Sequence, residues 1–163
     1  MGRPRALLLF NPNATTTDDA VRDVIASALA SAVELSIQPT KQRGHATHLA
    51  AGAVHEGVDV VFALGGDGTA NEVLQALAGT PVKLGIIPGG GANVFARALG
   101  LPNDAVHATS VLLERLREYP VLDLSIEEAP LEDVFMRFYG GEGGEGTTPN
   151  GRGATPAEVT DDV

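Results

Sequence analysis

A glycine-rich turn between a buried strand and a helix constrains this chain more than any other feature. The run Gly65-Gly66-Asp67-Gly68-Thr69 follows a mostly apolar segment, residues 58–64, which is typical of a buried parallel strand. Residues 69–78 carry apolar side chains at helical spacing, which predicts a helix directly after the turn. Glycine lets the backbone turn sharply and approach a ligand closely. The amides of such a turn, with the positive end of the helix, favour a phosphate site.

Asp67 is an unusual neighbour for a phosphate, because like charges repel. A Mg²⁺ ion between the carboxylate and the phosphate, bound directly or through water, would reconcile the two. Asp67 is therefore the candidate metal ligand. The alternative is an ordinary glycine turn whose aspartate caps the helix, but the Asn71-Glu72 pair directly after the turn favours the functional interpretation.

Strand and helix patterns alternate over residues 1–124. Apolar runs predict strands at 6–10, 33–37, 58–64, 82–87 and 121–124, and helical spacing predicts helices at 21–29, 45–56, 69–78, 93–99 and 104–117. Thr15, Thr16 or Thr17 is expected to cap the first helix, ahead of Asp18 and Asp19. This order predicts an α/β fold in three layers, with a parallel sheet between helices. Ligands of such sheets bind at the carboxyl ends of the strands.

The charge of the chain changes near residue 120. Residues 1–120 carry 11 acidic and 9 basic side chains, whereas residues 121–163 carry 10 acidic and 2 basic ones. Residues 140–163 contain almost no apolar side chains, so we expect a disordered acidic, Gly-rich tail there. The net charge of −10 argues against non-specific binding to nucleic acid, which depends on clustered Lys and Arg.

Cysteines and long apolar runs are both absent from the sequence. It has no cysteine, which excludes disulfides and thiolate metal sites. No apolar run is long enough for a signal-peptide core or a membrane span. We therefore expect a cytoplasmic protein.

Four motifs in order resemble the diacylglycerol kinase catalytic domain, which is shared by bacterial lipid kinases and sphingosine kinases. The glycine turn followed by Asn71-Glu72-Val73 is the first of them. The others are Asn11-Pro12 after the first strand, Thr40 with Gly44-His45-Ala46 at the second helix, and a second glycine loop in residues 88–97. The resemblance covers residues 5–120. It implies the nucleotide-binding fold of the NAD kinase and diacylglycerol kinase type, with residues 1–124 as the ATP-binding domain.

The resemblance also implies a reaction and a set of roles. ATP with Mg²⁺ would donate its γ-phosphoryl group to a lipid hydroxyl, by positioning and by neutralising phosphate charge. Asp67 is the motif carboxylate placed to act as catalytic base. A lipid substrate implies contact with the inner face of the membrane. The residues expected around ATP are Asn11, Thr40, Gly65, Gly66, Asp67, Gly68, Thr69, Asn71, Glu72, Gly89, Gly90, Gly91 and Asn93.

Structural interpretations stay open for some residues near these motifs. Asn93 fits a helix-start residue with a local backbone bond, which is the commoner use of Asn. His45 fits a helix-start residue packed on its turn, and Arg97 fits a solvated helix residue.

The sequence departs from this family after residue 124. Members of the family are much longer, and their second, mostly β domain supplies most of the lipid pocket. Residues 125–139 instead resemble the C-terminus of ABC-transporter ATPase subunits and include a predicted helix at 131–139, which suggests a truncation or a fusion of two gene ends. A first domain on its own would expose an apolar face, which favours a homo-oligomer.

Two alternatives to a lipid kinase follow from these observations. One is a non-catalytic remnant that binds nucleotide and turns nothing over. The other is an NAD kinase-like enzyme, which shares the glycine turn and the fold, although the second glycine loop follows the lipid-kinase pattern.

Overall fold

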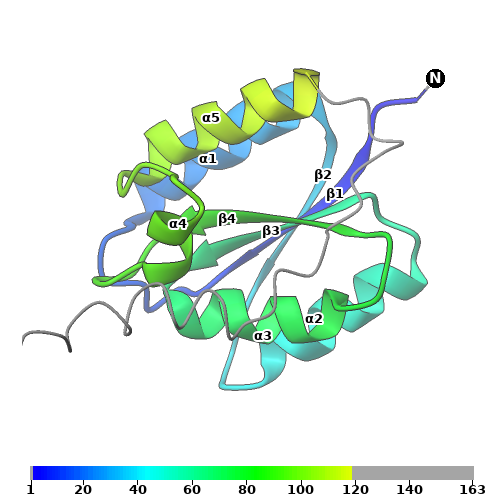
Figure 1. Cartoon of the computed structure of the whole chain (residues 1–163), viewed down its shortest axis with the longest axis horizontal. Helices are drawn as coiled ribbons and strands as arrows, with labels where there is room; N and C mark the ends of the chain where they lie inside the picture. The colour runs from blue at the N-terminus through cyan, green and yellow to red at the C-terminus, as the bar shows by residue number, and fades with distance from the viewer. Residues whose placement is uncertain (1, 119–163) are drawn as a thin grey trace, which may run out of the picture. The chain divides into compact units, whose positions relative to one another are not determined.

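Four parallel strands form the sheet, in the order β2-β1-β3-β4. The computed structural model describes residues 2–118. The strands are β1 (Arg5–Phe10), β2 (Glu34–Pro39), β3 (Val60–Gly65) and β4 (Lys83–Pro88), and the helices are α1 (Asp19–Ala32), α2 (His45–His55), α3 (Asp67–Leu77), α4 (Val94–Ala98) and α5 (Ala105–Glu118). Helices α1 and α5 cover one face of the sheet, and α2 and α3 cover the other (Figure 1). The predicted three-layer α/β fold is confirmed.

The central strands carry apolar side chains on both faces, because helices cover both sides of the sheet. On β1, Leu7 and Leu9 pack with the α2–α3 layer, while Ala6 and Leu8 pack with the α1–α5 layer. All six residues of β3 are buried. The continuous apolar runs in the sequence therefore reflect burial from two sides, and they fix β1 and β3 at the centre.

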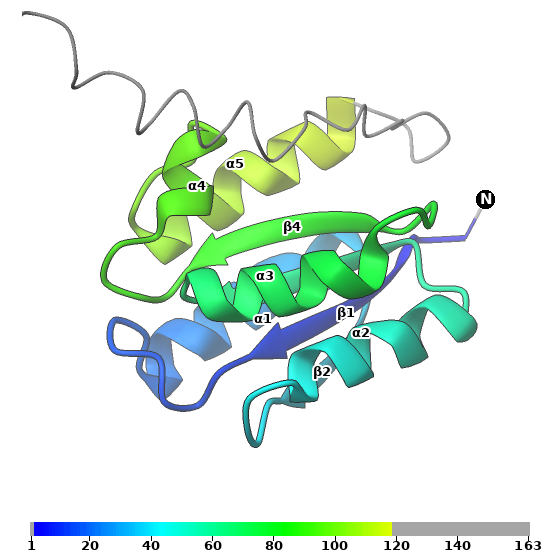
Figure 2. The same cartoon turned by 60° about the horizontal axis from the view of Figure 1, so that its bottom comes forward.

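The chain leaves the two central strands in opposite directions. After β1 it enters α1 on one face of the sheet, and after β3 it enters α3 on the other face (Figure 2). The loops at the carboxyl ends of these adjacent strands therefore diverge. Open parallel sheets bind their ligands at this kind of position, so the topology already selects the residues after Phe10 and Gly65 as the functional edge.

Two helix starts differ from the sequence prediction. The cap of α1 is Asp18, not a threonine of residues 15–17, because the extended Asp18 places Oδ1 2.8 Å from Val21 N. Helix α3 begins at Asp67 rather than at residue 69, because Gly66 is extended and the helix starts directly after it. Asp67 is therefore the first residue of the helix.

One strand start also differs, because Val33 still belongs to the end of α1. Its N–H donates to Leu29 O, so β2 begins at Glu34 rather than at residue 33. The strand predicted at 121–124, the helix at 131–139 and the tail at 140–163 lie outside the described residues.

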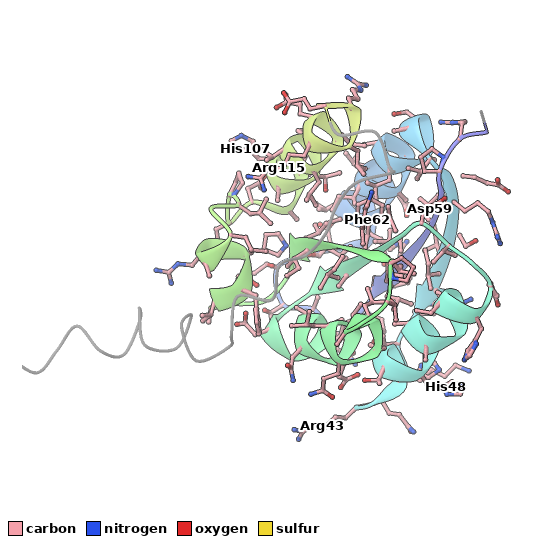
Figure 3. The ribbon with its side chains drawn as sticks, turned by 45° about the vertical axis from the view of Figure 1, so that its right-hand side comes forward. Arg43, His48, Asp59, Phe62, His107 and Arg115 are labelled. Atoms are coloured by element: carbon pink, nitrogen blue, oxygen red, sulfur yellow. The ribbon has the colours of Figure 1, made fainter. Side chains whose placement is uncertain are left out.

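Gly85 on β4 provides a test of the core beneath α5. A Cβ at this position would overlap the ring of Phe62, which is buried between the sheet and the α1–α5 layer (Figure 3). We expect Gly85→Ala to lower the free energy of unfolding by about 1–3 kcal/mol, because overpacking displaces a buried side chain. Urea denaturation measures this change.

The matched control is Gly52→Ala in α2, where a Cβ meets no atom within 4 Å. Alanine in a helix interior is more favourable than glycine by about 0.5–1 kcal/mol. This variant should therefore be at least as stable as the parent. Equal losses in the two variants would contradict the packing described here.

Candidate functional site

The N-terminus of α3 has no side-chain cap. Gly66 is the N-cap residue, with φ −84° and ψ −174°, and no side chain accepts a hydrogen bond from this end of the helix. The helical bonding starts with Ala70 N donating to Gly66 O. The amides of residues 67–69 therefore have no acceptor within the helix. They lie at the carboxyl edge of the sheet, where the positive end of the helix dipole adds to their attraction for an anion.

The other helices within residues 2–118 have a carboxylate at or near their first turn. Asp18 accepts from Val21 N at α1, and Asp104 accepts from His107 N at 2.7 Å at α5. The carboxylates at α2 and α4 both come from α3. Helix α3 thus provides caps for two neighbours and leaves its own N-terminus open.

Asp67 joins the first glycine turn to α4. Its Oδ1 accepts a hydrogen bond from Phe95 N at 3.0 Å. Ala70 of α3 and Ala96 of α4 belong to one buried cluster, which packs the two helices together behind this bond. Sequence reasoning missed this tether, because it joins residues far apart in the chain and no local pattern marks it.

The two glycine loops pack backbone against backbone. Gly65 pairs with Pro88 in the sheet, and Gly89 N donates to Gly65 O at 2.8 Å. A Cβ on Gly90 would lie 2.7 Å from Gly66 Cα, which real Cβ atoms do not tolerate. Glycine is required here by this close approach. The two loops therefore form a single surface around the open end of α3.

Asn93 fixes the shape of the second loop from inside. Among residues 2–118, Asn93 is the one non-glycine residue with a positive φ, which is 47°. The residue is 3% exposed. Its Oδ1 accepts from Gly90 N at 2.9 Å, and its Nδ2 donates to Gly90 O at 2.6 Å and to Asn103 Oδ1 at 2.8 Å. This is the local backbone bonding that the sequence allowed for Asn93. The residue shapes the site, and its polar atoms face the loop.

The loop after β1 lies beside both glycine segments. Asn11 N donates to Leu64 O at 3.1 Å, which ties the end of β1 to the end of β3. Asn11 Oδ1 accepts from Asn13 N at 2.9 Å, and its Nδ2 has no hydrogen bond within the described residues. Thr17 Oγ1 is buried without a hydrogen-bond partner, 3.1 Å from where a Cβ of Gly89 would stand.

The remaining predicted site residues divide into two groups. Thr40 follows β2, held by Thr40 N donating to Phe10 O at 2.8 Å, and the half-buried side chain of Asn71 has no hydrogen bond within the described residues. Both stay available at this edge. Glu72 instead points to α2, where Oε1 accepts from Gly44 N at 2.8 Å and Oε2 from Ala46 N at 3.2 Å.

The structural interpretations of His45 and Arg97 agree with the structure. His45 is a helix-start residue whose Nδ1 accepts from Lys41 N at 3.0 Å. Arg97 is exposed on α4, as expected of a solvated residue. Arg43 also points outward, from the loop that leads into α2 (Figure 3).

Residues 2–118 contain neither a preformed metal cluster nor a membrane-spanning helix. No cluster there brings together three or more His, Cys, Asp or Glu side chains around a metal position. A divalent cation at Asp67 would therefore take its other ligands from phosphate oxygens and water, as Mg²⁺ often does. No helix in this part of the chain is both long and apolar enough to cross a bilayer.

A parallel sheet with an open helix N-terminus between two glycine loops defines an α/β domain with the structural features of a phosphate site. The model of the diacylglycerol kinase catalytic domain matches residues 5–123. The chain belongs to this family.

Comparisons with individual proteins agree with the family. The diacylglycerol kinases of Staphylococcus aureus strains JH9 and Newman are 41% identical over 118 residues, which covers 69% of this chain and 37% of each relative. A crystal structure of a diacylglycerol kinase from Bacillus anthracis str. Sterne is similar with a TM-score of 0.64 and 34% identity, over 71% of this chain and 45% of that one. A second structure from that organism has a TM-score of 0.62 and 32% sequence identity, over 71% of this chain and 43% of that one. The chain spans less than half the length of these relatives.

Asn93 offers a test of the second loop. We expect Asn93→Ala to lower the free energy of unfolding by about 2–4 kcal/mol, because it loses buried hydrogen bonds and forces alanine into a left-handed backbone. Guanidinium denaturation measures the loss.

Asn93→Gly separates the two causes, because glycine adopts a positive φ without strain. Its free energy of unfolding should fall by about 1 kcal/mol less than that of the alanine variant. The exposed neighbour Val94 supplies the control Val94→Ala, with a loss under about 0.5 kcal/mol. If Asn93→Ala is no less stable than this control, the described role of Asn93 is wrong.

Proposed function

We propose that this chain is the nucleotide-binding part of an ATP-dependent lipid kinase, which transfers the γ-phosphoryl group of MgATP to the hydroxyl of diacylglycerol or a related lipid. The observation that carries the proposal is the open N-terminus of α3 between two glycine loops. Membership of the diacylglycerol kinase catalytic domain family supports the kinase class. The names of the relatives support the lipid acceptor.

The charges at this edge favour a phosphate accompanied by a cation. The segments 65–69 and 88–93 contain neither Lys nor Arg. The loops therefore supply backbone amides and a helix dipole, which carry only partial positive charge. Mg²⁺ would supply the remaining charge on a triphosphate. Asp67 is its proposed ligand, through Oδ2 or through water, since Oδ1 bonds to Phe95 N.

The remaining residues of the site have roles in positioning. The amides of residues 67–69 would orient the phosphates, and Thr69 Oγ1 lies beside them in the first turn of α3. Asn11, Thr40 and Asn71 have polar atoms available for the nucleoside. Phosphoryl transfer depends mainly on such positioning and on charge neutralisation. Asp67 is also the motif carboxylate proposed to accept the proton of the lipid hydroxyl.

The proposal places the reaction at the inner face of the membrane, where the lipid acceptor lies. The chain spans 37% of the length of the Staphylococcus aureus relatives, and the lipid acceptor is proposed from the names of those relatives. Self-association through exposed apolar surface remains a prediction, and Val24 and Leu99 are among the exposed aliphatic side chains that would take part.

The test is phosphoryl transfer from γ-labelled ATP to diacylglycerol in mixed micelles. We expect labelled phospholipid from the parent chain, and none from Asp67→Ala at equal protein concentration. MgATP binding is measured in parallel by calorimetry. Binding without transfer to any lipid would support the non-catalytic alternative, and labelled NADP from added NAD would support the NAD kinase-like one.

A glycine pair tests the surface formed by the two loops. Gly90→Ala should weaken MgATP binding by about tenfold or more, because its Cβ forces Gly66 away and separates the loops. Gly52→Ala is the control, since a Cβ there meets nothing within 4 Å and the residue lies in α2 outside both loops, and its affinity should stay within about twofold. Equal affinities for the two variants would show that the close approach of the loops does not shape the site.

A further inference from the structure

The N-terminus of α2 lies at the same edge of the sheet as the N-terminus of α3. Both helices follow the carboxyl end of a strand and pack against one another on the same face (Figure 1). Gly44 takes a left-handed conformation, φ 83°, and leads directly into α2. Each helix therefore begins with amides that have no acceptor within its own helix, at a positive dipole end, so each has the basic features of an anion site.

Glu72 distinguishes the two positions. Its two carboxylate oxygens accept from Gly44 N at 2.8 Å and from Ala46 N at 3.2 Å. Thr47 Oγ1 also donates to Glu72 O at 2.9 Å, which holds the start of α2 against the middle of α3. A phosphate at α2 would need the same amides and would meet the negative charge of Glu72. The site at α2 is therefore occupied by the protein itself.

We propose that Glu72 is a positioning residue that fills the N-terminus of α2 as an internal anion, so that phosphate groups bind at α3 alone. This inference rests on the proposed function, since it concerns the placement of the nucleotide phosphates. It also explains how a carboxylate fits so close to a phosphate site. The charge of Glu72 is balanced by the dipole of α2 and does not act against a ligand at α3.

Glu72 also holds the loop that carries Thr40. Residues 40–44 connect β2 to α2, with Thr40 N bonded to Phe10 O at one end and Gly44 N bonded to Glu72 at the other. Between them, His45 Nδ1 accepts from Lys41 N. Removing Glu72 releases one end of this loop, so the position of Thr40 relative to the nucleotide becomes less defined.

The experiment follows backbone amides by ¹⁵N–¹H NMR while inorganic phosphate is added. In the parent chain we expect shifts at residues 67–69 and none at Gly44 or Ala46. In Glu72→Ala we expect shifts at both sets, because the α2 amides become open to phosphate. In Glu72→Gln we expect shifts at both sets at a higher phosphate concentration, because the side chain loses its negative charge but keeps one acceptor oxygen for one of the two amides. Glu72→Gln retains the size of the side chain and carries the test if Glu72→Ala does not fold.

The matched control is Asp59→Ala. Asp59 Oδ2 also accepts from a backbone amide, Arg5 N at 2.8 Å, but at the opposite edge of the sheet. We expect MgADP affinity to fall about tenfold in Glu72→Ala and to stay within about twofold in Asp59→Ala. The control variant should also show no phosphate shifts at α2, which separates anion exclusion from a general loss of stability.

Two outcomes would overturn the proposal. One is a phosphate shift at Gly44 and Ala46 in the parent chain, and the other is no shift there in a folded Glu72 variant. Failure of the proposed function gives a different result, in which residues 67–69 of the parent chain do not respond to phosphate or to MgADP. The α2 amides still decide the role of Glu72 in that case.

Discussion

The close backbone contact between the two glycine loops is the constraint on which the rest of the functional edge depends. Gly65 and Gly66 meet Gly89 and Gly90 at distances that leave no room for a Cβ at Gly90. This contact continues the β3–β4 pairing beyond the last ladder residues. It brings α4 beside α3, where Phe95 N reaches Asp67. Without it, the open helix end would face solvent alone instead of lying in a shaped surface.

The distribution of carboxylates explains why one helix end is available and the others are not. Each described helix except α3 has an acidic side chain bonded at its first turn. Helix α3 carries Asp67 and Glu72, but both point to neighbouring helices. Two negative charges near the proposed phosphate site are thereby held by positive helix ends. The same bonds fix the positions of α2 and α4 relative to α3.

Much of the fold follows from local sequence pattern. The apolar runs of β1 and β3 and the alternating helical spacing predict a parallel sheet covered on both faces, since burial from two sides removes the polar alternation. The glycine turn at residues 65–68 predicts an anion site once Asn71-Glu72 is read with it, because a glycine turn alone also fits an ordinary helix start. These features depend on residues close together in the chain, which is why the sequence is sufficient to predict them.

The features that the sequence does not predict depend on residues far apart in the chain. No local pattern shows that Glu72 bonds to Gly44 or that Asp67 bonds to Phe95. Local pattern predicts a threonine cap for α1 because Ser, Thr and Asp have similar cap preferences, and the extended backbone of Asp18, with its bond to Val21 N, decides among them. The sequence thus predicts which residues gather at this edge, and the structure separates those whose polar groups stay open there from those that hold the helices.

The central claim is that the open end of α3 binds the phosphates of a nucleotide. A crystal structure of the chain grown with MgADP tests it most directly. We expect phosphate oxygens within about 3 Å of the amide nitrogens of residues 67–69, with the metal ion facing Asp67. ADP bound with its phosphates away from these amides, at the start of α2 or elsewhere on the sheet, would contradict the account.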